Sequence, residues 1–207
     1  MTKIKFCGLK NPGDVLMMNK YNPDYVGFVF YEKSHRNVSK IEAKYLSSLL
    51  NRNIIPVGVF VNENPENIVS LFKSDTIKVA QLHGNENEDY INFLKKESFK
   101  NTNRKLKVIK ALEITNNEKI SSWQYSNADY LLFDSGKGSG KVFDWSLIKN
   151  IKKPFFVAGG LNSNNVNGVI QKLNPYAVDV SSGIETNKIK DEKKVKEFIK
   201  NVNHVSK

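Results

Sequence analysis

The segment PFFVAGGLNSNNVNGVIQKLNPYAVDVSSGIE, residues 154–185, decides the fold. Two short apolar runs within it, Phe155–Ala158 and Ala177–Val180, each end in residues with small side chains. Such residues let backbone N–H groups converge on an anion, and the start of a following helix adds a favourable dipole. The alternative is that the glycines only end the strands. We predict a phosphate site that contains Gly159, Gly160, Ser181, Ser182 and Gly183.

Eight short β-rich runs recur along the 207 residues, and segments with helical spacing lie between them. This alternation predicts βαβ units and a parallel sheet. Two strand-to-loop units that share a phosphate near the end of the chain are typical of a (β/α)₈ barrel, which is an α/β fold of the TIM-barrel type. The predicted strands are Lys3–Cys7, Tyr25–Phe30, Ile55–Val61, Lys78–Leu82, Leu106–Lys110, Tyr130–Phe133, Phe155–Ala158 and Ala177–Val180.

An open, doubly wound sheet is the structural competitor. It usually has the pattern G-x-G-x-x-G after its first strand, whereas this chain has Gly8-Leu9-Lys10-Asn11 there. No Pro-, Gly- and Ser-rich linker interrupts the chain, so we expect residues 1–207 to form a single domain. The fifth unit is the weakest, because Ser121–Ser126 has only a faint helical pattern. The run Gly136–Val142 superficially resembles a Walker loop but fails its spacing rule.

The composition limits which partners and which cellular location we expect for the protein. The net charge of +11 suggests nucleic acid, but the lysines lie mostly on predicted helix faces, so we expect no nucleic-acid partner. No apolar run approaches the ~20 residues of a membrane span, and no signal segment precedes the first strand. The single cysteine, Cys7, excludes an internal disulfide and fits a reducing cytoplasm.

In a (β/α)₈ barrel, residues at the carboxyl ends of the strands face one active site. These ends combine a possible base or nucleophile, a fixed cation, a possible acid and hydrogen-bonding groups. No second histidine or carboxylate stands at a metal-ligand spacing from the histidine among them, so we expect no metal site. The candidate residues are Cys7, Arg36, Gln81, His83, Asp134 and Asp179.

Each of these residues also has an ordinary structural explanation. Cys7 at a strand end is often an inert packed residue. Asp134 follows an apolar run, where desolvation helps a carboxyl group to keep its proton, but it could equally cap the next turn. Arg36 lies in a polar loop where a solvated arginine is the default, although its guanidinium suits a carboxylate ligand.

Several motifs, in order from residue 3 to residue 191, closely resemble the phosphoribosylanthranilate isomerase family of tryptophan biosynthesis. They are KIKFCGLKNPGDV, YVGFVFYEKSHRNVS, VGVFVNENPENI, VAQLHGNE, GSGKVFDW, FFVAGGLNSNNV and AVDVSSGIE followed by KIKD. The resemblance implies a (β/α)₈ barrel. It also implies an Amadori rearrangement of the phosphorylated small molecule N-(5-phosphoribosyl)anthranilate to 1-(2-carboxyphenylamino)-1-deoxyribulose 5-phosphate, without a metal or redox cofactor.

The resemblance also implies roles for single residues. Cys7 matches the general base that removes the proton from C2 of the ribose, and the cysteine must then supply thiolate near neutral pH. Asp134 matches the general acid that protonates the furanose oxygen. Arg36 matches the arginine near the anthranilate carboxylate, and His83 and Asp179 match substrate contacts. The glycines and serines of residues 159–160 and 181–183 match the phosphate loops.

The loop after Asp134 looks several residues shorter than is common in the family. Two other enzyme classes compete with this function: a sugar isomerase with two aspartates, and an indole-forming synthase with a lysine acid. Lys110, at the end of the predicted fifth strand, is available for the second. The third alternative is a noncatalytic module that binds an anionic ligand or nucleic acid. The related aminoimidazole carboxamide ribotide intermediate of histidine synthesis remains open as a second substrate. The sequence allows a monomer or a homodimer.

Overall fold

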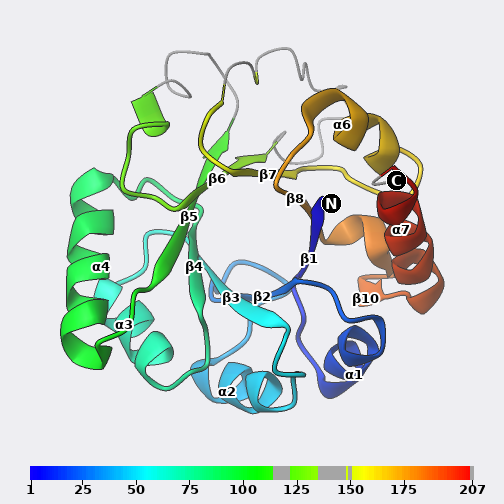
Figure 1. Ribbon diagram of the computed structural model, residues 1–207. Helices are drawn as coiled ribbons and strands as arrows, with labels where there is room; N and C mark the ends of the chain where they lie inside the picture. Colours follow the sequence, from blue (N-terminus) through cyan, green and yellow to red (C-terminus); the bar gives the residue numbers. More distant parts are fainter. Residues whose placement is uncertain (114–121, 135–147, 149–150, 206–207) are drawn as a thin grey trace.

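The computed structural model describes residues 1–113, 122–134, 148 and 151–205. Its centre is a closed barrel of eight parallel strands with helices outside, viewed in Figure 1 along the barrel. This confirms the predicted fold class and excludes the open sheet. The strands are β1 (Lys3–Cys7), β2 (Tyr25–Val29), β3 (Ile55–Phe60), β4 (Val79–Leu82), β5 (Lys107–Glu113), β6 (Tyr130–Asp134), β7 (Phe155–Ala158) and β8 (Ala177–Val180).

Polar side chains define where the helices begin. Asn11, Ser39 and Asn64 each accept a hydrogen bond from a backbone N–H group of the first turn, which satisfies a donor that has no partner within the helix. The helices are α1 (Pro12–Tyr21), α2 (Lys40–Ser48), α3 (Pro65–Lys73), α4 (Glu88–Thr102), α6 (Val166–Leu173) and α7 (Glu192–Val205), with a short 3₁₀ helix η2 (Ser182–Ile184) and a hairpin of β9 (Glu185–Thr186) and β10 (Ile189–Lys190).

Alternation along each strand divides the core into two layers. Tyr25 and Val57 belong to a cluster inside the barrel, whereas Val26 and Phe28 pack against the helices outside. Because successive side chains of a strand point to opposite faces, residues two positions apart share the barrel interior. Lys5 and Cys7 therefore point to the same side of β1.

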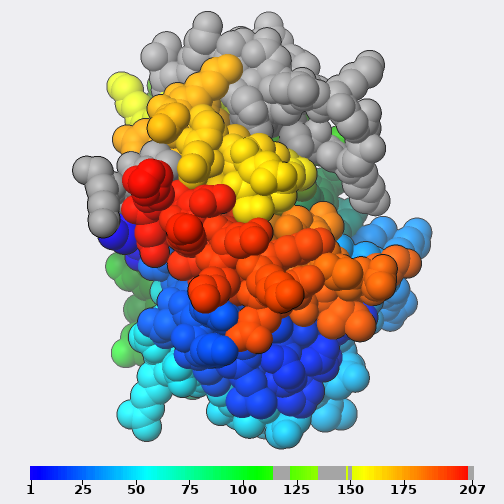
Figure 2. Space-filling model, turned by 90° about the vertical axis from the view of Figure 1, so that its right-hand side faces the viewer, coloured from blue at the N-terminus to red at the C-terminus, as the bar shows by residue number. Residues whose placement is uncertain are grey.

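The first and last strands close the barrel. Lys5 of β1 pairs in register with Asp179 of β8, which brings residues 174 positions apart into contact. Outside the barrel, Glu192 of α7 accepts hydrogen bonds from Lys20 and Tyr21 of α1. Figure 2 shows the resulting contact between the blue N-terminal segments and the red and orange C-terminal segments.

The structure moves several predicted strand boundaries by one residue, moves the end of the fifth strand by three, and leaves some predictions untested. We expected the fifth strand to end at Lys110, but β5 continues to Glu113. Lys110 therefore lies inside the strand. Its side chain is buried, and the carboxylate of Glu86, 2.9 Å from Nζ, compensates its charge. The Walker-like loop, the shorter loop after Asp134 and most of the proposed fifth helix lie outside the described residues.

Candidate functional site

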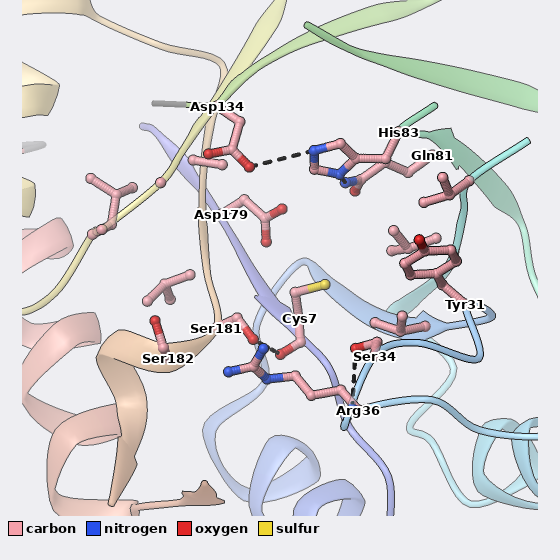
Figure 3. A pocket seen from close by; sticks show the side chains of 18 of the residues that line it. Cys7, Tyr31, Ser34, Arg36, Gln81, His83, Asp134, Asp179, Ser181 and Ser182 are labelled. Carbon is pink, nitrogen blue, oxygen red and sulfur yellow. Dashed lines mark hydrogen bonds and ion pairs between the residues drawn. The ribbon is translucent and has the colours of Figure 1, made fainter. Parts of the chain in front are cut away.

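A cavity of about 720 Å³ lies at the carboxyl ends of the barrel strands. Figure 3 shows its side chains converging from several strands and their following loops. Ten of the eleven predicted site residues line it, and Gly183 does not. The ten are Cys7, Arg36, Gln81, His83, Asp134, Gly159, Gly160, Asp179, Ser181 and Ser182.

Cys7 occupies the end of β1, with its thiol pointing into the cavity (Figure 3). Burial raises the pKa of this thiol, and the positive charges of Lys5 and Lys190 act in the opposite direction. The net pKa is raised, so the thiol form is favoured at neutral pH. This opposes the thiolate that the family resemblance led us to expect.

Lys5 is a site neighbour that our sequence reasoning missed. Its side chain is 0% exposed, and its Nζ lies 2.8 Å from Oδ2 of Asp179. Burial disfavours the ammonium form, but the charge and the hydrogen bond of the Asp179 carboxylate, with a further contribution from Cys7, outweigh this effect and raise the pKa of Lys5. The signal was present in the sequence, because Lys5 stands two residues before Cys7 and so shares its face of the strand.

Asp134 ends β6 and meets His83 from the loop after β4. The Nε2 atom of His83 lies 3.5 Å from Oδ2 of Asp134, and its Nδ1 atom lies 3.4 Å from Nε2 of Gln81. The amide oxygen of Gln81 and Oδ1 of Asp179 are buried without a hydrogen-bond partner among the described residues. Both residues line the cavity, so these atoms are suited to the hydroxyl groups of a ligand.

The loops after β7 and β8 carry the residues of the predicted anion site, and four of the five line the cavity. Gly159 and Gly160 have φ values of 88° and 64°, a left-handed conformation that glycine adopts without strain. Gly183 does not line the cavity, and a Cβ atom there would lie 1.8 Å from the carbonyl oxygen of Leu161. Its missing side chain therefore lets the two loops approach each other.

Arg36 reaches the cavity from the loop after β2 and is held by Glu185 of β9. Its Nε and Nη2 atoms donate to the two carboxylate oxygens at 2.8 and 2.7 Å. Glu185 was not among the predicted site residues, although it ends the quoted SSGIE motif. Among the residues that the structure describes, no three His, Cys, Asp or Glu side chains gather as ligands of a metal ion would.

One family model covers nearly the whole chain, including the strand ends that line the cavity. That model, described as N-(5'-phosphoribosyl)anthranilate (PRA) isomerase, matches residues 4–201. The chain belongs to this family.

Relatives in the N-(5'-phosphoribosyl)anthranilate isomerase family match over nearly their full length. The protein of that name from Endomicrobium trichonymphae is 46% identical over 205 residues, which cover 97% of this chain and 98% of the relative. The crystal structure of the Thermotoga maritima isomerase is 36% identical with a TM-score of 0.87, and the match covers 99% of this chain and 100% of that one.

A third relative adds a ligand. It is a crystal structure of a phosphoribosyl anthranilate isomerase in complex with reduced 1-(o-carboxyphenylamino)-1-deoxyribulose 5-phosphate. Its TM-score is 0.85 at 35% identity, with 99% of this chain and 100% of that chain covered. The expected family and fold are thereby confirmed.

Proposed function

We propose that this protein catalyses the Amadori rearrangement of N-(5'-phosphoribosyl)anthranilate to 1-(2-carboxyphenylamino)-1-deoxyribulose 5-phosphate in tryptophan biosynthesis. The observation that carries the proposal is that Cys7 and Asp134 face one cavity, which the small-residue loops after β7 and β8 also line. A base and an acid of different character thus flank the space that a phosphorylated pentose would fill.

The reaction begins at the ring oxygen of the ribose. Asp134 donates a proton to this oxygen, the C1–O bond breaks, and the nitrogen lone pair forms the C=N bond of a protonated Schiff base. Cys7, as thiolate, then removes the proton from C2, and the electron pair forms an enolamine that tautomerises to the ketone. Atoms balance because the substrate and the product are isomers. Lys5 and Lys190 support the thiolate, since their charges lower the pKa of Cys7.

The remaining site residues orient the substrate. Arg36 binds the anthranilate carboxylate, because a guanidinium is suited to a planar carboxylate. The loops after β7 and β8, with Ser181 and Ser182 among their residues, hold the phosphate with backbone N–H groups and the hydroxyl of Ser182. Gln81, His83 and Asp179 contact the sugar. Binding the phosphate away from the reacting carbons contributes orientation, so its energy lowers the barrier at C1 and C2.

Two variants test the acid and base roles. We expect Cys7→Ser and Asp134→Asn to lower the turnover of freshly prepared N-(5'-phosphoribosyl)anthranilate by at least about 100-fold, measured as substrate consumed and product formed. Asp89→Asn is the matched control, because Asp89 is exposed in the first turn of α4 and makes the same change of charge. Near-normal turnover in Asp134→Asn would remove this residue from the acid role.

We further propose a cytoplasmic location and no nucleic-acid partner. A free thiol that must act as a base is compatible with a reducing compartment. Among the described residues, no helix combines the length and the apolar character needed to cross a bilayer. Fractionation of cells that express the tagged protein tests the location, and a filter-binding assay with duplex DNA at physiological salt tests the second statement.

A further inference from the structure

The carboxylate of Glu185 fixes the orientation of Arg36. The two hydrogen bonds from Nε and Nη2 define the plane of the guanidinium, and the Glu185 side chain is only 7% exposed. Hydrogen bonds from Arg36 and Lys190 overcome the effect of burial and lower the pKa of Glu185 to about 2. Glu185 is therefore ionised at neutral pH, and the remaining donors of Arg36 are directed to a ligand in a defined orientation.

An arginine paired with a glutamate is neutral as a pair, which weakens its attraction for an anionic substrate. Lys190 compensates for this, because its Nζ donates to Oε1 of Glu185 at 2.8 Å. Burial lowers the pKa of Lys190, but its Nζ also meets the carbonyl oxygens of Cys7 at 2.7 Å and Ser181 at 3.2 Å. Three acceptors match the three N–H bonds of an ammonium ion, so the three-residue cluster carries one net positive charge.

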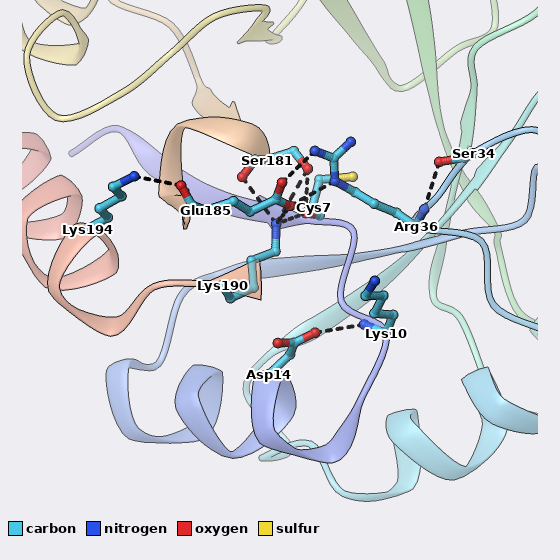
Figure 4. A network of polar contacts seen from close by, with 9 residues as sticks. All are labelled: Cys7, Lys10, Asp14, Ser34, Arg36, Ser181, Glu185, Lys190 and Lys194. Atoms are coloured by element: carbon cyan, nitrogen blue, oxygen red, sulfur yellow. Dashed lines mark hydrogen bonds and ion pairs between the residues drawn. The ribbon is translucent and has the colours of Figure 1, made fainter. Parts of the chain in front are cut away.

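The same ammonium ion joins three parts of the site, as Figure 4 shows. It contacts the end of β1 through Cys7, the loop after β8 through Ser181, and the glutamate that holds Arg36. The hydroxyl of Ser181 donates to the same carbonyl of Cys7 at 2.9 Å. The cation for the carboxylate, the strand that carries the base and a phosphate loop are thus tied together.

The hairpin of β9 and β10 places these two charged residues side by side. Glu185 and Lys190 are directly paired across it. Between them Asn187 and Lys188 have φ values of 51° and 64°, the left-handed conformations that a tight two-residue hairpin turn requires. The Nζ atom of Lys194 donates to the backbone carbonyl of Glu185 and does not contact the charged groups of the cluster.

We propose that Glu185 and Lys190 are positioning residues for the isomerisation: Glu185 orients Arg36 toward the aromatic carboxylate of the substrate, and Lys190 keeps the cluster positively charged. This inference rests on the proposed function. It assigns a task to the short hairpin after β8 that the acid–base chemistry alone does not need.

A pair of ligands tests the task of Lys190. The first is reduced 1-(o-carboxyphenylamino)-1-deoxyribulose 5-phosphate, and the second is the same compound without the carboxyl group. By calorimetry, we expect Lys190→Met to weaken binding of the first about tenfold and binding of the second less than about twofold, since one interaction with a charged group is lost. Equal weakening of both ligands overturns the proposal, because Lys190 would then act only through the phosphate loop or the fold.

Lys194→Met is the matched control. It removes a lysine from the same region and a contact to the same glutamate, but it leaves the charge cluster intact. We expect it to bind both ligands as the wild-type protein does. A weakening equal to that of Lys190→Met would contradict a specific role of the cluster.

The double variant Glu185→Gln, Lys190→Met separates charge from general damage. It restores one net positive charge at Arg36, so we expect its KM to be lower than that of Lys190→Met. Its kcat should stay below that of the wild type, because the carboxylate of Glu185 no longer orients the guanidinium. A purely structural role predicts that the double variant is worse in both constants, and this result would overturn the proposal. If the wild-type protein fails to convert N-(5'-phosphoribosyl)anthranilate, the proposed function itself fails, whatever the variants bind.

Discussion

Replacing Lys5 by Met removes the positive half of an ion pair that closes the barrel. The Lys5 and Asp179 side chains are 0% and 6% exposed, and their charged atoms lie 2.8 Å apart. Breaking a buried pair on one side leaves an uncompensated charge and costs about 3–5 kcal/mol of stability. We therefore expect the free energy of unfolding, measured by equilibrium denaturation in urea at pH 7, to fall by about that amount.

The double variant Lys5→Met, Asp179→Leu provides the control for this measurement. Two apolar side chains of similar size avoid the desolvation of both charges, so stability should return to within about 1 kcal/mol of the wild type. A double variant that is as unstable as Lys5→Met would refute the reasoning. The same conclusion follows if Lys5→Met is itself as stable as the wild type.

The same variants report on the thiol of Cys7. Lys5 lowers its pKa and Asp179 raises it, with Lys5 the larger of the two charge effects. The pKa of Cys7 should therefore increase from the wild type to the double variant to Lys5→Met. The rate at which iodoacetamide alkylates the thiol, followed against pH, measures it, because Cys7 is the single cysteine of the chain. An identical titration in the wild type and Lys5→Met would refute the electrostatic role of Lys5.

Three further outcomes follow from the site. Hydrogen bonds from Arg36 and Lys190 lower the pKa of Glu185 from 4.5 to about 2 in the folded state, so the stability that its ionised form contributes is present above pH 4.5 and is lost as the pH falls toward 2. The Glu185→Gln variant should lack this loss during acid unfolding, and an acid unfolding profile equal to that of the wild type would argue against this reasoning. Gly183→Ala should force the phosphate loops apart and weaken inhibition by inorganic phosphate at least about tenfold, whereas unchanged inhibition would show that the loops tolerate the Cβ atom. The turnover rate plotted against pH should be bell-shaped, and the limb governed by Cys7 should lie at higher pH than an ordinary cysteine would give, because the pKa of Cys7 is raised. A flat profile under conditions where chemistry limits the rate would contradict the paired roles of Cys7 and Asp134.

Local patterns in the sequence were sufficient for the barrel and for most of the cavity. Apolar runs of four to six residues, helix caps such as Ser39 and the small-residue loops after residues 158 and 180 act over a few positions, so a single sequence reveals them. The parallel arrangement then places every strand end at one face. For this reason Cys7, His83 and Asp134 could be assigned to one cavity before any contact was known.

Tertiary structure alone decided which distant groups meet. Lys110 of β5 meets Glu86, a partner in another unit that compensates its buried charge. Arg36 meets Glu185 across 149 positions, and Lys5 meets Asp179 across 174. Local propensity carries no information about such pairings, because they exist only once the register of barrel closure and the fold of the last hairpin bring the charges within hydrogen-bonding distance. The sequence by itself therefore determined the strands, the loops and the face of the site, and the closed barrel determined its electrostatics.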